Sequence, residues 1–519
     1  MVAFAGTTVP ADVAQALGSS AFAGVTLFRD HNVESIAQVR ALTGALQQAA
    51  RADSRPLLIA ADQEGGQLNA LGDGPTDFAG PMAMGAAGDS ALTERVARAT
   101  AIELRALGVN VNYAPDCDLA TAPDNAALGI RSFGDAPAAV GEHAAAYVRG
   151  LQAEGVAATV KHFPGLGEAV ADTHHGVAVV GTSARELRER ELVPFRAAIA
   201  AGARLAMAGH VAFPALTGVD ELPASLAEPV LRGLLRDELG FQGLSITDAL
   251  DMRALAQGVA QVVDVITAVR AGEDLLLGTA DADLIARLAD GLAQAERRRL
   301  VDPASTTAVR SRLADLRRWL SSFDQPALDV VGCAAHVALA RELAERSITL
   351  VRNDDGLLPL SLAPDARVAV VQSPGARLTP ADTSDRVPPL LAEEVRRHAP
   401  HTDQFLTSDD PTDAEIGALR GRVAAYDVVI VGTAAAHLRS EQAALAQAIT
   451  DGHPRAIWVA LRTPWDVSVN PQTRTYVCSY GILGPSVQAL AAALFGEVPF
   501  LGRLPVEIKG LYARGHGLT

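Results

Sequence analysis

Acidic, basic and histidine side chains follow several of the short apolar runs in the first 280 residues, where the strands of a sheet would end. They are Asp62, Asp116, Lys161, His162, His210 and Asp248, with Arg131 in an intervening loop. Taken alone, an Asp or His at such a position is usually a helix cap or a hydrogen-bonded core residue. Charged groups gathered in one enclosure are costly unless they are paired or used, so their conjunction predicts a polar functional site.

Histidines are concentrated in the same part of the chain, which raises metal binding as an alternative. The candidate ligands are Asp172, His174, His175, His162 and His210. Histidine and carboxylate side chains in such numbers can hold a transition metal. Adjacent histidines point in different directions, however, and Lys161 would place a positive charge beside the cation. We therefore expect no metal at this site.

The polar residues must be positioned by strands, and apolar runs alternate with long Ala-rich helical stretches through the first 280 residues. Eight runs have strand character: residues 2–4, 24–28, 56–61, 109–116, 158–163, 205–211, 244–247 and 274–277. This alternation predicts βα units and a parallel sheet, and eight strands close a (β/α)8 TIM barrel. An open doubly wound sheet would favour a glycine-rich phosphate turn after the first strand, but Phe4 is followed by Ala-Gly-Thr-Thr. In a barrel, the polar residues would share one rim.

A second alternation of strands and helices follows a polar break at residues 321–326. We place the barrel domain at residues 1–322, a linker at 323–340 and a three-layer α/β sandwich domain at 341–519. Apolar runs predict five strands in this second domain, at residues 348–351, 368–371, 428–431, 457–461 and 476–478. The acidic, turn-rich stretch 402–415 is interpreted as a surface loop.

Composition limits the classes of protein that fit. The chain has 519 residues, of which 49% are hydrophobic and 20% charged, and its net charge of −16 repels phosphate backbones and anionic lipid. We expect no nucleic-acid partner and no membrane span. The three cysteines are too far apart for a zinc site or a disulfide framework. We expect a cytoplasmic monomer or homodimer. Because the chain opens almost directly on a strand, a missing upstream segment is an open alternative.

Four segments carry a recognisable pattern: Asp62-Gln-Glu-Gly-Gly66, Lys161-His-Phe-Pro-Gly165, Asp172-Thr-His174 and Gly240-Phe-Gln-Gly-Leu-Ser-Ile-Thr-Asp248. The pattern continues in the second domain with Ser347-Ile-Thr-Leu-Val-Arg-Asn353, Leu357-Leu-Pro-Leu360 and Gly502-Arg-Leu-Pro505. Together these segments resemble glycoside hydrolase family 3, specifically its bacterial β-N-acetylglucosaminidase branch. The resemblance spans nearly the whole chain. It implies a small carbohydrate substrate and no metal or organic cofactor.

The resemblance also implies roles for individual residues. A retaining glycosidase needs a carboxylate nucleophile and a separate proton donor. Asp248 would be the nucleophile, and His174, oriented by Asp172, would be the proton donor. An imidazole with a pKa of about 6.5 can donate a proton in one step and accept one in the next. The residues implied to contact or support the sugar are Asp62, Arg131, Lys161, His162, His210, Asp116 and, as a pocket wall, Met252.

The expected activity is that of a retaining exo-β-N-acetylglucosaminidase, which removes terminal N-acetylglucosamine from muropeptide or chitin-derived fragments through a covalent glycosyl-aspartate. A glycoside phosphorylase and a β-glucosidase of the same family are alternatives, and a non-catalytic sugar-binding protein is an alternative of a different class. The chain departs from the family pattern at Leu166, Gln67 and Ala70, where the family commonly has a histidine and two arginines. These departures leave the exact substrate open.

Overall fold

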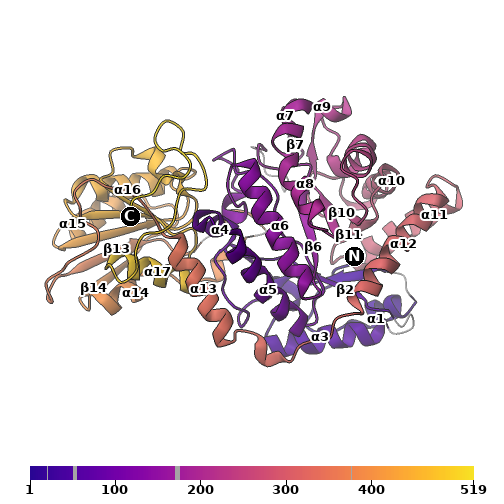
Figure 1. The fold of residues 1–519 in the computed structure, drawn as a ribbon, viewed down its shortest axis with the longest axis horizontal. Helices are drawn as coiled ribbons and strands as arrows, with labels where there is room; N and C mark the ends of the chain where they lie inside the picture. The colour runs from indigo at the N-terminus through magenta and orange to yellow at the C-terminus, as the bar shows by residue number, and fades with distance from the viewer. Residues whose placement is uncertain (20–21, 51–54, 170–175, 376, 381) are drawn as a thin grey trace.

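Two bodies lie side by side along the long axis of the molecule (Figure 1). The computed structural model describes residues 1–519 apart from 20–21, 51–54, 170–175, 376 and 381. The first body, coloured from indigo through magenta to salmon, is built around a parallel sheet. The second body, coloured orange to yellow, contains a sheet of its own.

The first body is a nearly closed parallel barrel. Its strands, in spatial order, are β1 (Gly24–Thr26), β2 (Leu58–Ala61), β5 (Val111–Asn112), β6 (Ala157–Phe163), β8 (Leu205–Ala208), β10 (Leu244–Ala249) and β11 (Leu275–Leu277). Residues 1–3 lie between the two ends of this sheet. The Gly278 N–H donates to Met1 O at 2.8 Å and the Thr26 N–H donates to Val2 O at 2.8 Å. The predicted (β/α)8 barrel is confirmed, with its first strand reduced to a single bridge between Val2 and Val25.

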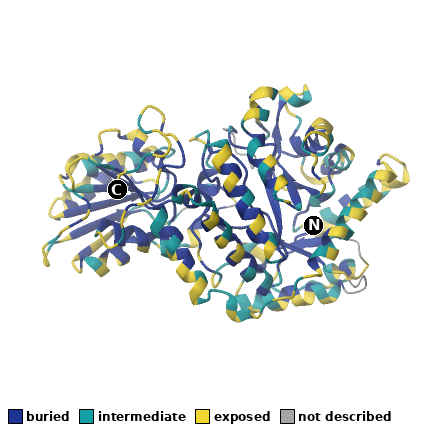
Figure 2. Cartoon of the chain, in the orientation of Figure 1, coloured by how far each residue is buried: buried dark blue, intermediate teal, exposed yellow. Residues whose placement is uncertain are grey.

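Strand residues alternate between the barrel interior and the surrounding helices, because successive side chains of a strand point to opposite faces. Leu58 and Ala60 of β2 pack in the interior cluster, whereas Ile59 and Ala61 pack in the cluster that includes the helices. Figure 2 shows the result: the strands are buried, and the helices around them have exposed outer faces. The main helices are α3 (Ile36–Ala49), α5 (Ser90–Ala106), α6 (Pro137–Ala153), α8 (Leu192–Ala200), η4 (Pro229–Glu238), α10 (Gln261–Ala271), α11 (Ala282–Arg297) and α12 (Pro303–Leu320).

The second body is a three-layer α/β sandwich. Its sheet has the order β12 (Thr349–Asn353), β17 (Thr475–Cys478), β16 (Ala456–Ala460), β15 (Val428–Thr433), β13 (Val368–Gln372) and β14 (Thr402–Leu406). Only β12 pairs antiparallel among these strands. One face is covered by α13 (Ala334–Ser347), α14 (Leu391–His398) and α17 (Gly484–Leu494). The other is covered by α15 (Asp413–Val423) and α16 (Ser440–Gly452).

The interpretation of residues 402–415 as a surface loop is wrong. The stretch contains the edge strand β14 and the start of α15. Asp403 and Gln404 are exposed while Phe405 is buried, so a half-exposed edge strand has a polar sequence. Thr412 and Glu415 form a capping box that begins α15, and their polarity reflects a helix start.

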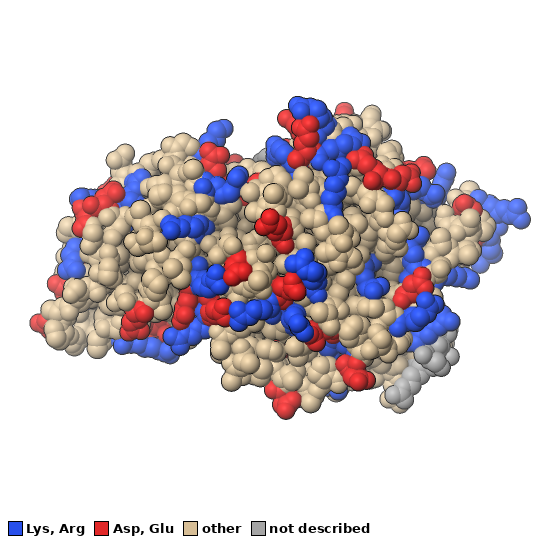
Figure 3. Space-filling view, viewed as in Figure 1, with Lys and Arg blue, Asp and Glu red and all other residues tan. Residues whose placement is uncertain are grey.

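The two bodies meet through α13, which contacts α4 (Pro81–Ala87) and α5 of the barrel as well as α17. Helix α12 ends at Leu320 and α13 begins at Ala334, so the first turns of α13 fall within the predicted linker 323–340. The boundaries 1–322 and 341–519 stay predictions. No helix in the described parts of the chain is long and apolar enough to cross a membrane. Basic and acidic side chains intermix on the face shown in Figure 3.

Candidate active site

The predicted polar residues that the structure describes lie at the carboxyl ends of the barrel strands. Asp62 follows β2, Lys161 and His162 stand near the end of β6, and Asp248 is the penultimate residue of β10. Arg131 is the last residue of the short helix η2 (Gly129–Arg131), which lies in the connection between β5 and β6. The barrel therefore brings residues from distant parts of the sequence to one rim.

A buried network of ion pairs lies at this rim. Lys161 Nζ lies 2.7 Å from Asp62 Oδ1 and 2.5 Å from Glu64 Oε1. Arg131 Nε and Nη2 donate to the two oxygens of Glu64 at 2.8 and 2.9 Å. Burial raises the pKa of Glu64, but Arg131 and Lys161 outweigh it and lower the value to about 2. Glu64 is thus an anion at neutral pH, and it holds two cations in place.

Sequence reasoning did not single out Glu64 as a site residue. It lies on the hairpin formed by β3 (Gln63–Gly65) and β4 (Leu68–Asn69), which folds back directly after Asp62. The motif Asp62-Gln-Glu-Gly-Gly66 did contain two carboxylates, and this was the available signal. Only the hairpin geometry shows that the second carboxylate is the one shared by Lys161 and Arg131.

His162 is fixed by a second carboxylate that the sequence did not single out. Asp118 Oδ2 lies 2.8 Å from His162 Nδ1 and accepts the His162 backbone N–H at 3.0 Å. Its other oxygen accepts the Leu166 N–H at 2.6 Å. Burial lowers the pKa of His162, but the hydrogen bond to Asp118 and the charges of Asp116 and Asp118 outweigh it and raise the value. With Nδ1 engaged, Nε2 is the ring nitrogen available to a ligand.

Asp116 occupies an unusual environment behind these groups. It is 1% exposed, and Arg131 Nε lies 3.4 Å from its Oδ2. Within the described residues, neither carboxyl oxygen accepts a hydrogen bond. Burial raises the pKa of Asp116 to about 7, although Arg131 opposes this. The carboxyl therefore titrates near neutral pH in the middle of the charged network.

We expect Asp116→Asn to stabilise the protein increasingly as the pH rises from about 4 to about 7. In this window the folded protein holds a proton on Asp116 that the unfolded chain releases, so wild-type stability falls with rising pH. Asparagine cannot ionise and escapes this loss, which is about 1.4 kcal/mol for each unit of pKa shift. Thermal unfolding between pH 4 and 8 measures the difference. Asp124→Asn, at an exposed position of the same loop, is the control. A pH-independent difference would contradict the expectation.

The same cluster has the residue types of a metal site, but its other contacts do not suit a cation. Ligand atoms of Asp116, Asp118 and His162 lie within 4.8 Å of one another. Asp118, however, already accepts the two backbone N–H bonds, and the guanidinium of Arg131 stands beside Asp116. A divalent cation would face an adjacent positive charge and occupied ligands. The donor set supports the expectation that the site works without a metal.

Asp248 is half-buried, and its Oδ1 accepts the Ala249 N–H at 2.8 Å. Burial raises its pKa, but the positive charge of His162 and the Ala249 N–H outweigh burial and hold the pKa below its usual value. Asp248 is therefore an ionised carboxylate at neutral pH. Met252 is 6% exposed in the turn that follows β10.

His210 supports β10 through hydrogen bonds. Its Nδ1 lies 2.7 Å from Ser225 Oγ and its Nε2 lies 3.1 Å from Ala249 O. Burial lowers the pKa of His210, so the ring is neutral at neutral pH. Because both ring nitrogens are engaged by the protein, we expect His210 to position the end of β10 rather than to contact a ligand.

Asp172, His174 and His175 lie outside the described residues. Residues 166–169, which precede this segment in the sequence, are described. Asn125 Nδ2 donates to Leu166 O at 3.0 Å, and Arg190 Nη2 donates to Glu168 Oε1 at 2.6 Å. Leu166 and Ala70, two positions that depart from the expected pattern, are both buried. The third, Gln67, accepts the Ile130 N–H at 3.4 Å.

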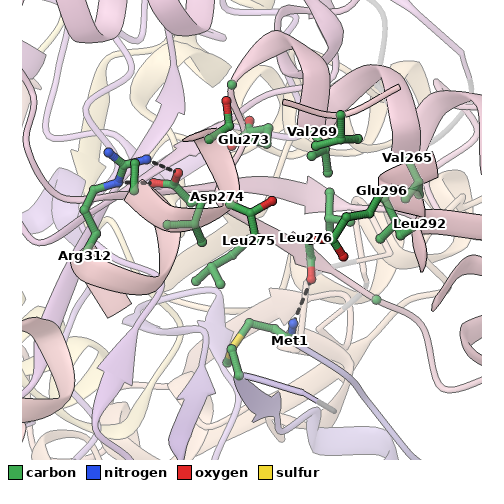
Figure 4. A pocket seen from close by; sticks show the side chains of 18 of the residues that line it. Met1, Val265, Val269, Glu273, Asp274, Leu275, Leu276, Leu292, Glu296 and Arg312 are labelled. Carbon is green, nitrogen blue, oxygen red and sulfur yellow. Dashed lines mark hydrogen bonds and ion pairs between the residues drawn. The ribbon is translucent and has the colours of Figure 1, made fainter. Parts of the chain in front are cut away.

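A cavity of about 910 Å³ lies elsewhere, between β11 and the helices α10, α11 and α12 (Figure 4). Most of its walls are apolar, and Arg312 ion-pairs with Asp274 there at 2.5 Å. The Met1 amino group donates to Leu276 O at 2.9 Å. None of the polar rim residues described above lines this cavity. We therefore place the candidate active site at the strand ends, where the charged groups converge.

Comparisons with known proteins agree on one family. Residues 2–307 match the model of the glycosyl hydrolase family 3 N-terminal domain. A β-N-acetylglucosaminidase/β-glucosidase from Cellulomonas fimi is 32% identical over 87% of this chain and 84% of that protein. The solved glycoside hydrolase family 3 β-N-acetylglucosaminidase from Paenibacillus sp. str. FPU-7 is 32% identical over 98% of this chain and 97% of that chain, with a TM-score of 0.90. The β-glucoside phosphorylase BglX is 25% identical over 94% of this chain and 90% of that chain, with a TM-score of 0.80.

Proposed function

Because the chain belongs to glycosyl hydrolase family 3 and is a glycoside hydrolase acting on a carbohydrate, we propose that it is a retaining exo-β-N-acetylglucosaminidase. Its substrates would be muropeptide or chitin-derived fragments with a terminal N-acetylglucosamine. One observation carries the proposal: an ionised Asp248 stands on the same rim as the Lys161, Asp62 and Arg131 network. The relatives from Cellulomonas fimi and Paenibacillus are both named as β-N-acetylglucosaminidases, which supports N-acetylglucosamine as the sugar.

In the first step, Asp248 would attack the anomeric carbon and form a glycosyl ester. The bond to the leaving oxygen breaks as that oxygen takes a proton from His174, which Asp172 orients. A depressed pKa suits Asp248 to this role, because the nucleophile must be ionised before attack. An imidazole ordinarily has a pKa near neutrality, so a histidine such as His174 suits the role of proton donor.

In the second step, water would attack the same carbon from the face that the leaving group vacated. His174 removes a proton from this water, the ester bond breaks, and Asp248 is released as a carboxylate. Two displacements at one carbon retain the β configuration. The product is free N-acetylglucosamine with its original anomeric configuration.

The buried network would supply preorganised hydrogen-bond partners for the sugar. Glu64 holds Arg131 and Lys161, and Asp118 holds His162, so these donors need not reorganise when the substrate arrives. Asp62 is half-buried and bonds to Lys161 through only one oxygen, which leaves acceptor capacity for hydroxyl groups. Met252 would form part of the pocket wall.

A mechanism-based inactivator tests the proposal. A fluorinated N-acetylglucosaminide that forms a slow covalent intermediate should add one sugar mass to the peptide containing Asp248. Peptide mass spectrometry of the inactivated enzyme locates the added mass. If the enzyme cleaves the parent glycoside and the mass lies on another residue, the assignment of the nucleophile is wrong.

We expect His174→Ala to lower kcat/KM for substrates with poor leaving groups by about 10²–10⁴-fold, the usual contribution of a general acid. A dinitrophenyl glycoside needs no protonation of its leaving group and should lose much less in the first step. His175→Ala, one residue away, is the matched control and should retain activity on both substrates. Equal losses on both substrates in His174→Ala would argue against the proton-donor role.

Phosphorolysis is a second candidate, favoured by the likeness to the β-glucoside phosphorylase BglX. A histidine proton donor lacks the negative charge with which a carboxylate repels phosphate, so phosphate could replace water in the second step. Product analysis with and without phosphate distinguishes the two reactions. If sugar 1-phosphate were the main product, the main reaction would be phosphorolysis and not hydrolysis. Nitrophenyl glucoside compared with its N-acetylglucosamine counterpart tests the β-glucosidase alternative.

A further inference from the structure

A short segment of the second domain, residues 382–387, contacts the barrel at the hairpin that carries Glu64. The Thr383 backbone N–H donates to Gln67 O at 2.9 Å, and the Thr383 hydroxyl donates to the same oxygen at 3.1 Å. The hydroxyl oxygen accepts the Asn69 N–H at 3.2 Å. These three bonds tie Thr383 to the backbone of the β3–β4 hairpin. We call residues 382–387 the docking segment.

The docking segment is anchored in the second domain by a buried ion pair. Asp382 is 1% exposed and Arg462 is 2% exposed, and Arg462 Nη1 lies 2.7 Å from Asp382 Oδ2. Asp382 also accepts the Leu378 N–H at 3.1 Å and the Ser384 N–H at 2.8 Å. A buried carboxylate with several donors fixes the backbone around it. Thr383 is therefore presented to the barrel from a rigid support.

A second contact joins the same domain to the loop that leads to Arg131. His437 Nε2 lies 3.1 Å from Pro123 O, while its Nδ1 lies 2.8 Å from Asp466 Oδ1. Two residues after Pro123, Asn125 bonds to Leu166 O, and Arg131 Nη1 donates to Ala127 O at 3.0 Å. The loop thus runs from the domain contact to a cation of the buried network.

Both contacts end on main-chain atoms: the Gln67 oxygen and the Asn69 N–H in the first contact, and the Pro123 oxygen in the second. The second domain therefore contacts these two backbones directly, whatever side chains they carry. One backbone leads to Glu64, which holds Lys161, and the other leads to Arg131. A shift of either backbone would change the distances within the network on which the sugar contacts depend.

We propose that the second domain positions the sugar-binding network of the barrel, with Thr383 as the positioning residue for the hairpin and His437 for the Arg131 loop. The proposal rests on the proposed function, because it assumes that the network contacts the sugar. It separates two roles: the barrel supplies every reacting group, and the second domain sets how tightly the sugar is held.

The hydroxyl of Thr383 gives a direct test. Thr383→Val removes both hydrogen bonds of the hydroxyl, the one donated to Gln67 O and the one accepted from the Asn69 N–H. It should raise KM for nitrophenyl N-acetylglucosaminide and weaken inhibition by N-acetylglucosamine by about two- to tenfold, the scale of a lost, partly buried hydrogen bond. The value of kcat should change less than the value of KM. Thr383→Ser keeps the hydroxyl and should restore wild-type values. Thr407→Val is the matched control, because the Thr407 hydroxyl in the same domain has no partner among the described residues.

Backbone hydrogen exchange of residues 63–69 provides a readout that needs no substrate. The Asn69 amide donates to Thr383 Oγ1, so exchange there should be faster in Thr383→Val and normal in Thr383→Ser. Wild-type exchange and wild-type KM in Thr383→Val would overturn the proposal. Faster exchange in an enzyme that cleaves no N-acetylglucosaminide would uphold the positioning of the hairpin and overturn the proposed function instead.

Discussion

Asp248→Asn is expected to lower kcat for nitrophenyl N-acetylglucosaminide by about 10⁴-fold or more, the scale on which the loss of a nucleophile acts. An amide in place of the carboxylate cannot form the glycosyl ester, so the first step has no acceptor for the sugar. The side chain keeps its size, and its oxygen can still accept the Ala249 N–H. We therefore expect N-acetylglucosamine to bind Asp248→Asn within about threefold of its wild-type affinity, a difference below 1 kcal/mol.

The comparison needs a control that changes charge without touching the reaction. Asp251 is exposed three residues further along, in the turn that follows β10, and Asp251→Asn removes one negative charge near the rim. This variant should keep kcat within about twofold, since exposed charges are largely screened by solvent. A kcat in Asp248→Asn above one tenth of the wild-type value would show that another group is the nucleophile.

Much of the rim was predictable because the hydrophobic pattern marks where the barrel strands end. Lys161, His162 and Asp248 each interrupt or end a buried apolar run, and a parallel barrel brings such positions to one side. Glu64 and Asp118 were not predicted as site residues, although both lie within one or two residues of a predicted one. Their partners are set by the hairpin after β2 and by the turn after β5, and no periodicity encodes that geometry.

The contact between the two domains lay beyond the reach of sequence patterns. Thr383 and Gln67 are 316 residues apart in the chain. Each stands in a polar segment whose local pattern indicates only a turn. Strand β14 escaped prediction for a related reason, since an edge strand exposes alternate residues to solvent and looks polar. The pattern of a sequence reports local burial well and pairings between distant segments poorly.

Glu64→Gln is expected to lower the free energy of unfolding by about 3–5 kcal/mol at neutral pH, the usual effect of removing one member of a buried ion pair. Glu64 is 3% exposed and neutralises Arg131 and Lys161. Glutamine has nearly the same size but no charge, so two buried cations would face each other across it. The same change should raise KM, because both cations belong to the proposed sugar contacts.

The pH dependence of this loss follows from the pKa of Glu64, which is about 2 in the folded protein against 4.5 ordinarily. A depressed carboxyl pKa contributes stability that is present above about pH 4.5 and disappears as the pH falls toward 2. Chemical denaturation at pH 7 and at pH 3 should therefore show a smaller gap between wild type and Glu64→Gln at the lower pH. Glu94→Gln is the matched control: Glu94 pairs with Arg149 at 2.9 Å on the surface, where ion pairs contribute at most about 1 kcal/mol. If Glu64→Gln proved as stable as Glu94→Gln, the ion pairs of Glu64 would not be a major source of stability.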